Sequence, residues 1–218
     1  MNSIKEEQAE TQRKEQRDRL LDCLTSSRRR LILLRLGDRS TPTPEEELVD
    51  YIASAERAEP REGDSSSDRR AVHTELRHIH LPKLVDTGLV RWDKSAETVT
   101  VVEHPLIDSP HFQQLIQRED EGWGEVLACL TDERRRTALE LLQSGSNSMT
   151  RDGLAREIAV REVDGEPSTE VLREVRAELH HQHLPKLGQA GLVDYTTPDE
   201  VVTYIGQPGL SKWPPEML

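Results

Sequence analysis

Histidine has the widest chemistry of the residues in this sequence, and six of the eight histidines gather in two stretches: His73, His78, His80, His180, His181 and His183. Imidazole is a common zinc ligand, so a metal site is one interpretation of this clustering. However, His78 and His80 are two residues apart and would face different sides of a helix. His180 and His183 share a face, but no cysteine or carboxylate cluster accompanies them to complete four ligands. We therefore expect neither a metal nor another cofactor.

The same histidines have a structural interpretation, because a proline follows each group. Pro82 and Pro185 lie inside segments whose apolar spacing predicts a helix, and a proline there removes a hydrogen bond and clashes with the preceding turn. We expect a kink or a new helix start at residues 80–81 and 183–184. The matched histidines would then satisfy the backbone groups left open beside each proline. Contact with a nucleic acid or a partner protein is the alternative.

Basic residues in the first half of the chain have the types that bind DNA. An arginine side chain binds a guanine edge or a phosphate with two parallel donors. The candidate DNA-binding residues, from one predicted helix and the hairpin after it, are Arg69, Arg70, His73, Arg77, Lys83, Arg91 and Lys94. The corresponding hairpin of the second half carries Asp194, Asp199 and Glu200, which would repel phosphate. We therefore expect the first half to contact DNA and Arg173 and Arg176 of the second half to contribute little.

The charge balance weighs against a simple nucleic-acid-binding surface. The chain has 41 acidic and 29 basic residues and a net charge of −12, whereas a basic patch usually marks a nucleic-acid-binding protein. The alternative is that the arginines pair with carboxylates on solvated faces. We expect the same of the arginine triplets 28–30 and 134–136, with anion binding near a helix start as the other option. An acidic surface with few lysines is typical of adaptation to high salt, and an ordinary acidic cytosolic protein is the alternative.

Signatures of other protein classes are missing from the sequence. We find no glycine-rich phosphate loop, nucleophile elbow or cysteine–histidine signature, and we expect no catalytic residue and no enzyme. Cys23 and Cys129 each precede Leu-Thr, which predicts matched burial in two cores, with a disulfide as the less favoured alternative. The N-terminus is charged, and no apolar run approaches the roughly 20 residues that span a bilayer. We therefore expect a cytoplasmic protein without a membrane partner.

One stretch occurs twice and sets the organisation of the chain. Residues 75–90 read ELRHIHLPKLVDTGLV and residues 178–193 read ELHHQHLPKLGQAGLV, with eleven identities over sixteen positions. This similarity indicates a duplicated structural unit. We predict two copies of one domain between an extension, a linker helix and an irregular tail: 1–19 polar extension, 20–104 first domain, 105–122 linker helix, 123–206 second domain and 207–218 tail.

Three helices and a β-hairpin must position the basic residues in each copy. The second helix is expected to begin at Thr43-Pro44, with Thr43 as its cap, Pro44 as its first residue and acidic residues behind them. The third helix has Val72, Leu76 and Ile79 as its apolar positions. Short β-branched runs after it predict a hairpin in each copy, at 89–92 with 98–102 and at 192–195 with 201–205. This order predicts a mainly α fold with small β-hairpin wings, in two tandem winged helix-turn-helix domains.

The repeated string His-x-His-Leu-Pro-Lys-Leu, followed by Gly-Leu-Val, resembles the helix that precedes the wing in ArsR- and MarR-type winged-helix regulators. It is more similar still to a haloarchaeal winged-helix-like domain family without an assigned activity. The resemblance implies a non-catalytic transcriptional regulator that binds double-stranded DNA as a homodimer or with a protein partner. The chain departs from the pattern, because about ten residues, 58–67, stand where a helix-turn-helix has a turn of about 3–4 residues. This departure favours the alternative, a winged-helix module for protein–protein interaction or dimerisation.

Overall fold

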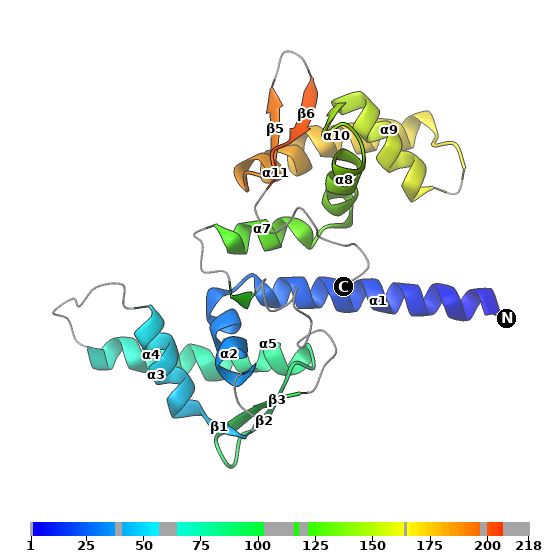
Figure 1. The fold of residues 1–218 in the computed structure, drawn as a ribbon. Helices are drawn as coiled ribbons and strands as arrows, with labels where there is room; N and C mark the ends of the chain where they lie inside the picture. The colour runs from blue at the N-terminus through cyan, green and yellow to red at the C-terminus, as the bar shows by residue number, and fades with distance from the viewer. Residues whose placement is uncertain are drawn as a thin grey trace. The chain divides into compact units, whose positions relative to one another are not determined.

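The computed structural model describes residues 2–37, 41–56, 65–102, 116–117, 122–163, 165–196 and 200–206. The chain divides into two compact units (Figure 1), residues 1–121 with 216–218 and residues 122–215, which we call unit 1 and unit 2. Each unit is mainly helical and contains a three-stranded antiparallel sheet. The predicted combination of a mainly α fold with small antiparallel sheets is therefore confirmed.

Unit 1 begins with the long helix α1, which takes in the polar segment predicted as an extension. Its elements in chain order are α1 (Asn2–Leu24), α2 (Ser27–Gly37), β1 (Thr43–Pro44), α3 (Glu45–Ala55), α4 (Ser65–Glu75), the π-helical turn η1 (Leu76–His80), α5 (Leu81–Asp86), β2 (Val90–Asp93) and β3 (Thr98–Val101). Among the side chains of α1 that the structure describes, the buried apolar ones lie in its last two turns, from Leu20 to Leu24. The end of α1 is thus the part that joins the core.

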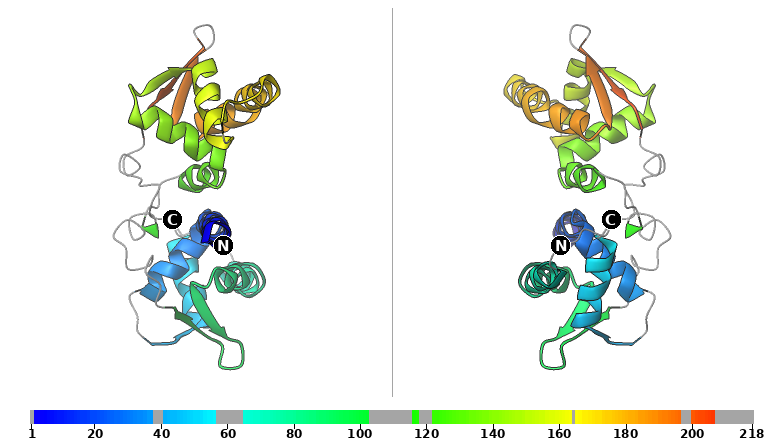
Figure 2. Two further views of the ribbon diagram at one scale, coloured as in Figure 1. Left: turned by 90° about the vertical axis from the view of Figure 1, so that its right-hand side faces the viewer. Right: turned by 90° about the vertical axis from the view of Figure 1, so that its left-hand side faces the viewer.

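Unit 2 repeats the same order from a shorter first helix. Its elements are α7 (Trp123–Leu130), α8 (Glu133–Ser144), β4 (Ser148–Thr150), α9 (Arg151–Glu162), α10 (Thr169–Glu178), the π-helical turn η2 (Leu179–His183), α11 (Leu184–Gln189), β5 (Val193–Thr196) and β6 (Val201–Tyr204). In Figure 2 the hairpin of each unit lies at the edge of that unit's helices. Both predicted hairpins are confirmed, with Val90 opposite Val101 and Val193 opposite Tyr204.

The third strand of each sheet directly precedes a helix, and in unit 1 it comes from residues that the sequence predicts as the helix start itself. Thr43 of β1 pairs with Val99, and Met149 of β4 pairs with Val202, so the strand orders are β1–β3–β2 and β4–β6–β5. Pro44, predicted as the first helical residue, has an extended backbone and precedes α3. Thr43 is fully buried in the strand and its side chain makes no cap bond. Strands of two or three residues have too few positions for an alternating pattern to be recognised.

A π-helical turn lies where the sequence predicts that proline disturbs the third helix. The N–H of Leu81 bonds to the carbonyl of Leu76, five residues back, and the backbone stays helical from α4 through α5. Pro82 then lies in the first turn of α5, where a proline is tolerated. The wider turn also keeps Leu76 and Leu81 on one face and turns Ile79 outward, where it is 53% exposed. The predicted kink or restart is therefore a change of hydrogen-bond pattern, which η2 repeats.

Both units use the same leucine positions for their cores. The following side chains are at most 1% exposed: Leu76, Leu81, Leu84 and Leu89 in unit 1, and Leu179, Leu184, Leu187 and Leu192 in unit 2. The prediction of matched cysteines is also confirmed, because Cys23 and Cys129 are buried free thiols. Burial raises the pKa of both thiols, which makes them poor nucleophiles.

Several predicted segments lie outside the described residues. They include most of the linker helix, most of the connector 58–67, Asp199 and the tail 207–218. Within the part of the chain that the structure describes, no helix has both the length and the apolar character needed to cross a membrane.

Replacing Leu84 by alanine should lower the free energy of unfolding by about 2–5 kcal/mol, because a fully buried side chain leaves a cavity that closes only in part. The neighbouring Val85 is 40% exposed and provides the control, since Val85→Ala should change stability by less than about 1 kcal/mol. Urea denaturation followed by circular dichroism measures both. Equal losses in the two variants would contradict the assignment of Leu84 to the core.

Candidate nucleic-acid interface

The third helix and the hairpin of unit 1 meet at Trp92 on β2. The indole N–H of Trp92 donates a hydrogen bond of 2.6 Å to Glu45 Oε1 at the start of α3. The guanidinium of Arg77 lies 5.9 Å from the centre of the ring, and Lys94 Nζ lies 4.7 Å from it. Cations at such distances are attracted to the face of an aromatic ring. Trp92 therefore contacts Glu45 of α3, Arg77 of η1 and Lys94 of its own hairpin, and these elements form one surface.

Arg77 is held inside this surface by two carboxylates. Its Nη1 lies 2.8 Å from Glu97 Oε1 and 3.4 Å from Glu45 Oε2, and Glu45 is only 2% exposed. The hydrogen bond from Arg77 to Glu97 and the charge of Glu45 raise the pKa of Arg77. The backbone N–H of Glu45 also donates to the carbonyl of Glu97, whose φ is 52°. Arg77 thus fixes the hairpin turn against the helices and has little capacity left for DNA.

Three more of the predicted DNA-binding residues face carboxylates. Arg69 Nε lies 2.8 Å from Asp50 Oδ1, and a second nitrogen of Arg69 bonds to Glu46. Lys83 Nζ lies 2.7 Å from Asp22 Oδ2. His73 Nε2 lies 4.0 Å from a carboxylate oxygen of Glu45, the acid that also faces Arg77. These three residues therefore lie next to Asp or Glu side chains, which is the alternative that the charge balance of the sequence offers.

Arg70, Arg91 and Lys94 remain as exposed cations of unit 1. Within the described residues, none of these three side chains has a carboxylate partner, and Lys94 rests on Trp92. Arg70 lies on α4, Arg91 on β2, and Lys94 in the turn between β2 and β3. Of the seven predicted residues, four therefore lie next to carboxylates, and the other three are exposed and could bind an external anion.

Unit 2 reverses the charges at the equivalent place. Arg151 stands where unit 1 has Glu45, and His180 stands where it has Arg77. Arg151 Nη2 donates to Glu200 Oε1 at 2.5 Å, and Nη1 lies 3.0 Å from His180 Nδ1. Arg173, the counterpart of Arg70, forms an exposed pair with Glu170 at 2.5 Å. The same framework therefore offers less free positive charge in unit 2.

The arginine triplets, predicted as solvated faces, are structural groups. Arg28 bonds to Glu56 at 2.5 Å and to Glu75, and so connects α2 to the end of α3 and to α4. Arg134 repeats this with Glu162, at 2.6 Å, and with Glu178. The sequence contained a signal for this structural role, because the three residues of unit 1, Arg28, Glu56 and Glu75, recur at matching places in unit 2 as Arg134, Glu162 and Glu178.

The second arginine of each triplet closes the first helix of its unit. Arg29 donates to the carbonyls of Cys23 and Asp22, and Arg135 donates to those of Cys129, at 2.7 Å, and Ala128, at 3.2 Å. The last carbonyls of a helix have no partner within it, and a cation is favourable at that end. Arg29 and Arg135 are 8% and 6% exposed. Neither is available to an external anion.

His80 and His183 are buried next to these arginines. They are 7% and 4% exposed, and in the described structure no ring nitrogen of either accepts or donates a hydrogen bond. The prediction that they bond backbone groups beside the prolines is therefore wrong, because the π turn already satisfies that backbone. Burial lowers the pKa of both imidazoles, and Arg29 and Arg28 lower that of His80 further. Among the described residues, no three His, Cys, Asp or Glu side chains converge as metal ligands.

Arg134→Ala should lower the free energy of unfolding by about 1–3 kcal/mol, because charged hydrogen bonds to Glu162 and Glu178 are lost at a site where Arg134 is only 23% exposed. Arg161→Ala is the matched control, since its pair with Glu140 is exposed and should contribute at most about 1 kcal/mol. Urea denaturation compares the two variants. A larger loss for Arg161→Ala would contradict the structural role of Arg134.

Lowering the pH below about 6.5 should destabilise the protein. The folded state holds His80 and His183 neutral below their ordinary pKa of 6.5, whereas the unfolded chain takes up the protons. The stability is therefore complete above pH 6.5 and falls from there toward the lowered folded-state pKa. Urea midpoints over a pH series measure this fall, and His80→Gln/His183→Gln should reduce it. An unchanged pH dependence in the double variant would refute the assignment.

Comparison with known proteins gives one family match. The family described as a domain of unknown function, DUF7344, matches residues 21–100 and 127–203. The two segments together make up well over half of the chain, and one falls in each unit. No curated protein and no solved structure matches the chain.

Proposed function

The chain belongs to the DUF7344 family, and we propose that it is a non-catalytic DNA-binding transcriptional regulator in which unit 1 contacts the DNA. Each unit would be a winged-helix domain, with the hairpin as its wing. The proposal rests on the distribution of unpaired cations in unit 1, and the family's description leaves the function open.

The order of elements supports the winged-helix interpretation. From α2 to β3, unit 1 runs helix, strand, helix, helix, strand, strand, and its short first strand β1 pairs with the last strand β3. This is the order of the winged-helix domains that the repeated motif resembles. In that arrangement the helix before the hairpin enters the major groove and the hairpin reaches the neighbouring backbone. Arg70, Arg91 and Lys94 lie on these two elements.

The single observation that carries the proposal is the position of Arg70, Arg91 and Lys94. They are exposed, no described carboxylate neutralises them, and they lie on the third helix and the hairpin that Trp92 holds together. Unit 2 has a paired arginine, Arg173, in place of Arg70 and an aspartate, Asp194, in place of Arg91. Attraction to phosphate therefore favours unit 1.

Arg70→Ala, Arg91→Ala and Lys94→Ala should each weaken binding to DNA and reduce the salt dependence of the binding constant by roughly one unit per lost phosphate contact. Fluorescence anisotropy with labelled duplex DNA of mixed sequence, at several salt concentrations, measures both. Arg173→Ala is the matched control, because it removes an arginine at the equivalent position of the other unit and should leave binding unchanged.

Two outcomes would overturn the proposal: no DNA binding by the full chain at any salt concentration, or an equal loss in Arg173→Ala. The second outcome would show that unit 2 contacts the DNA as well. The first would favour a second candidate function, a protein-interaction or dimerisation module. The observation behind that candidate is Ile79, which is 53% exposed on η1 although it is a large apolar residue. Ile79→Ser should then weaken self-association, as measured by analytical ultracentrifugation, and leave a DNA-binding function intact.

A further inference from the structure

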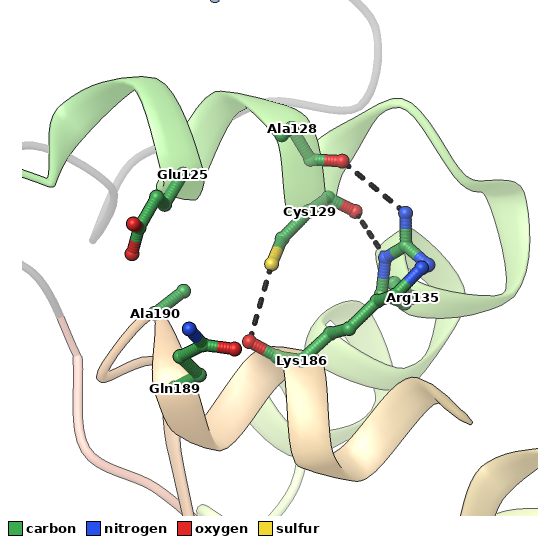
Figure 3. Close-up of a pocket in the computed structure, with 7 residues that line it drawn as sticks. All are labelled: Glu125, Ala128, Cys129, Arg135, Lys186, Gln189 and Ala190. Atoms are coloured by element: carbon green, nitrogen blue, oxygen red, sulfur yellow. Dashed lines mark hydrogen bonds between the residues drawn. The ribbon is translucent and has the colours of Figure 1, made fainter. Parts of the chain in front are cut away.

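Unit 2 contains an open pocket between α7 and the end of α11, with a volume of about 240 Å³ (Figure 3). Ala128 and Cys129 line it from α7, and Ala190 lines it just after α11. The backbone around the pocket is already bonded. The thiol of Cys129 donates to the carbonyl of Lys186 at 3.4 Å, and Arg135 donates to two carbonyls of α7. A ligand would therefore meet small side chains and the charged groups at the rim.

The equivalent place in unit 1 carries larger side chains that pair with one another or approach the cysteine. Ala128 corresponds to Asp22, whose carboxylate pairs with Lys83 at 2.7 Å. Ala190 corresponds to Thr87, whose hydroxyl lies 3.9 Å from the sulfur of Cys23. Lys186, the counterpart of Lys83, has thus lost its carboxylate partner in unit 2. Two exchanges to alanine within one duplicated framework remove these side chains from unit 2 and leave the cation of Lys186 at the edge of the pocket.

Charges of opposite sign border the pocket without pairing. Lys186 lies on α11, and Glu125 lies on α7, where unit 1 has Arg19. Within the described structure, neither side chain of unit 2 forms a hydrogen bond or an ion pair. Figure 3 shows the carboxylate of Glu125 on the side of the pocket that faces Gln189 and Ala190. The rim therefore offers an acceptor for a cationic group and donors for an anionic group, and the lining adds the side chains of two alanines.

The size of the pocket limits the ligand to a small molecule. A volume of 240 Å³ holds about eight water molecules at ~30 Å³ each, which is the room that a solute of roughly six to ten non-hydrogen atoms needs. A molecule of this size that carries an ammonium group, a carboxylate and a short apolar chain matches the kinds of side chain that line the pocket. Small aliphatic α-amino acids have this composition.

We propose that unit 2 binds a small zwitterionic amino acid in this pocket. Its ammonium group bonds to Glu125, its carboxylate bonds to Lys186 and to the amide of Gln189, and its side chain packs on Ala128 and Ala190. The binding site is independent of the DNA-binding surface proposed for unit 1, and it gives the two copies of the domain different functions.

The test is titration of the full ¹⁵N-labelled chain with L-valine, followed by backbone amide chemical shifts. We expect saturable shifts centred on Ala128, Cys129, Lys186 and Ala190. Two matched probes dissect the charges: isovalerate lacks the amino group of valine, and isobutylamine lacks its carboxylate. Both should bind at least about tenfold more weakly than valine, because each leaves one charged group of the rim without a partner.

Two variants locate the site and keep the test independent of folding. Ala128→Asp/Ala190→Thr installs the residues that unit 1 tolerates at the same places, so the fold is kept while the new carboxylate at position 128 neutralises Lys186 and the pocket fills. Lys186→Gln keeps the pocket open and removes the charge. Valine binding should be lost in the first variant and weakened at least about tenfold in the second. The proposal is overturned by an absence of saturable shifts, by equal binding of isovalerate, or by valine binding that survives in the first variant.

Discussion

The structure of each unit depends on how the first helix ends. α1 and α7 stop inside the body of their units, where carbonyl groups without helical partners would be costly to bury. The planar guanidinium of Arg29 or Arg135 supplies several donors in fixed directions and bonds to two of these carbonyls at once. The arginine before it, Arg28 or Arg134, extends the same framework to two glutamates on other helices. Two adjacent arginines in each unit therefore have two roles: one bonds the last carbonyls of the first helix, and the other bonds glutamates of neighbouring helices.

Duplication of this framework leaves the differences between the two copies free to change function. The leucine core, the π turn and the arginine caps are the same in both units. The differences lie elsewhere: Glu45 and Arg77 become Arg151 and His180, and Asp22 and Thr87 become Ala128 and Ala190. Because the framework supplies most of the stability, such exchanges can accumulate without loss of the fold. The two copies therefore need not bind the same kind of molecule.

An acidic chain uses most of its arginines internally, and this constrains any DNA-binding surface. The chain has a net charge of −12, and a guanidinium next to two carboxylates, such as that of Arg69 or Arg77, attracts a phosphate only weakly. The number of arginines on a helix is therefore a poor measure of its affinity for nucleic acid. What counts is the subset that the fold leaves without a carboxylate, and of the seven candidate residues of unit 1 that subset is Arg70, Arg91 and Lys94, on the helix and the hairpin joined by Trp92.

The sequence by itself determined the duplication, the two hairpins, the matched burial of the cysteines and the leucine core, because each is recorded in local periodicity or in identity between the halves. It also predicted where the third helix is disturbed, at Pro82 and Pro185. Only the tertiary structure decided the rest. The strands at 43–44 and 148–150 exist because a distant strand pairs with them, and Ile79 is exposed because the π turn shifts the helical phase. Whether an arginine caps a helix, pairs with a carboxylate or faces solvent depends on partners up to 49 residues away, as for Arg151 and Glu200. Local sequence records the type of such a side chain, and the fold supplies its partner.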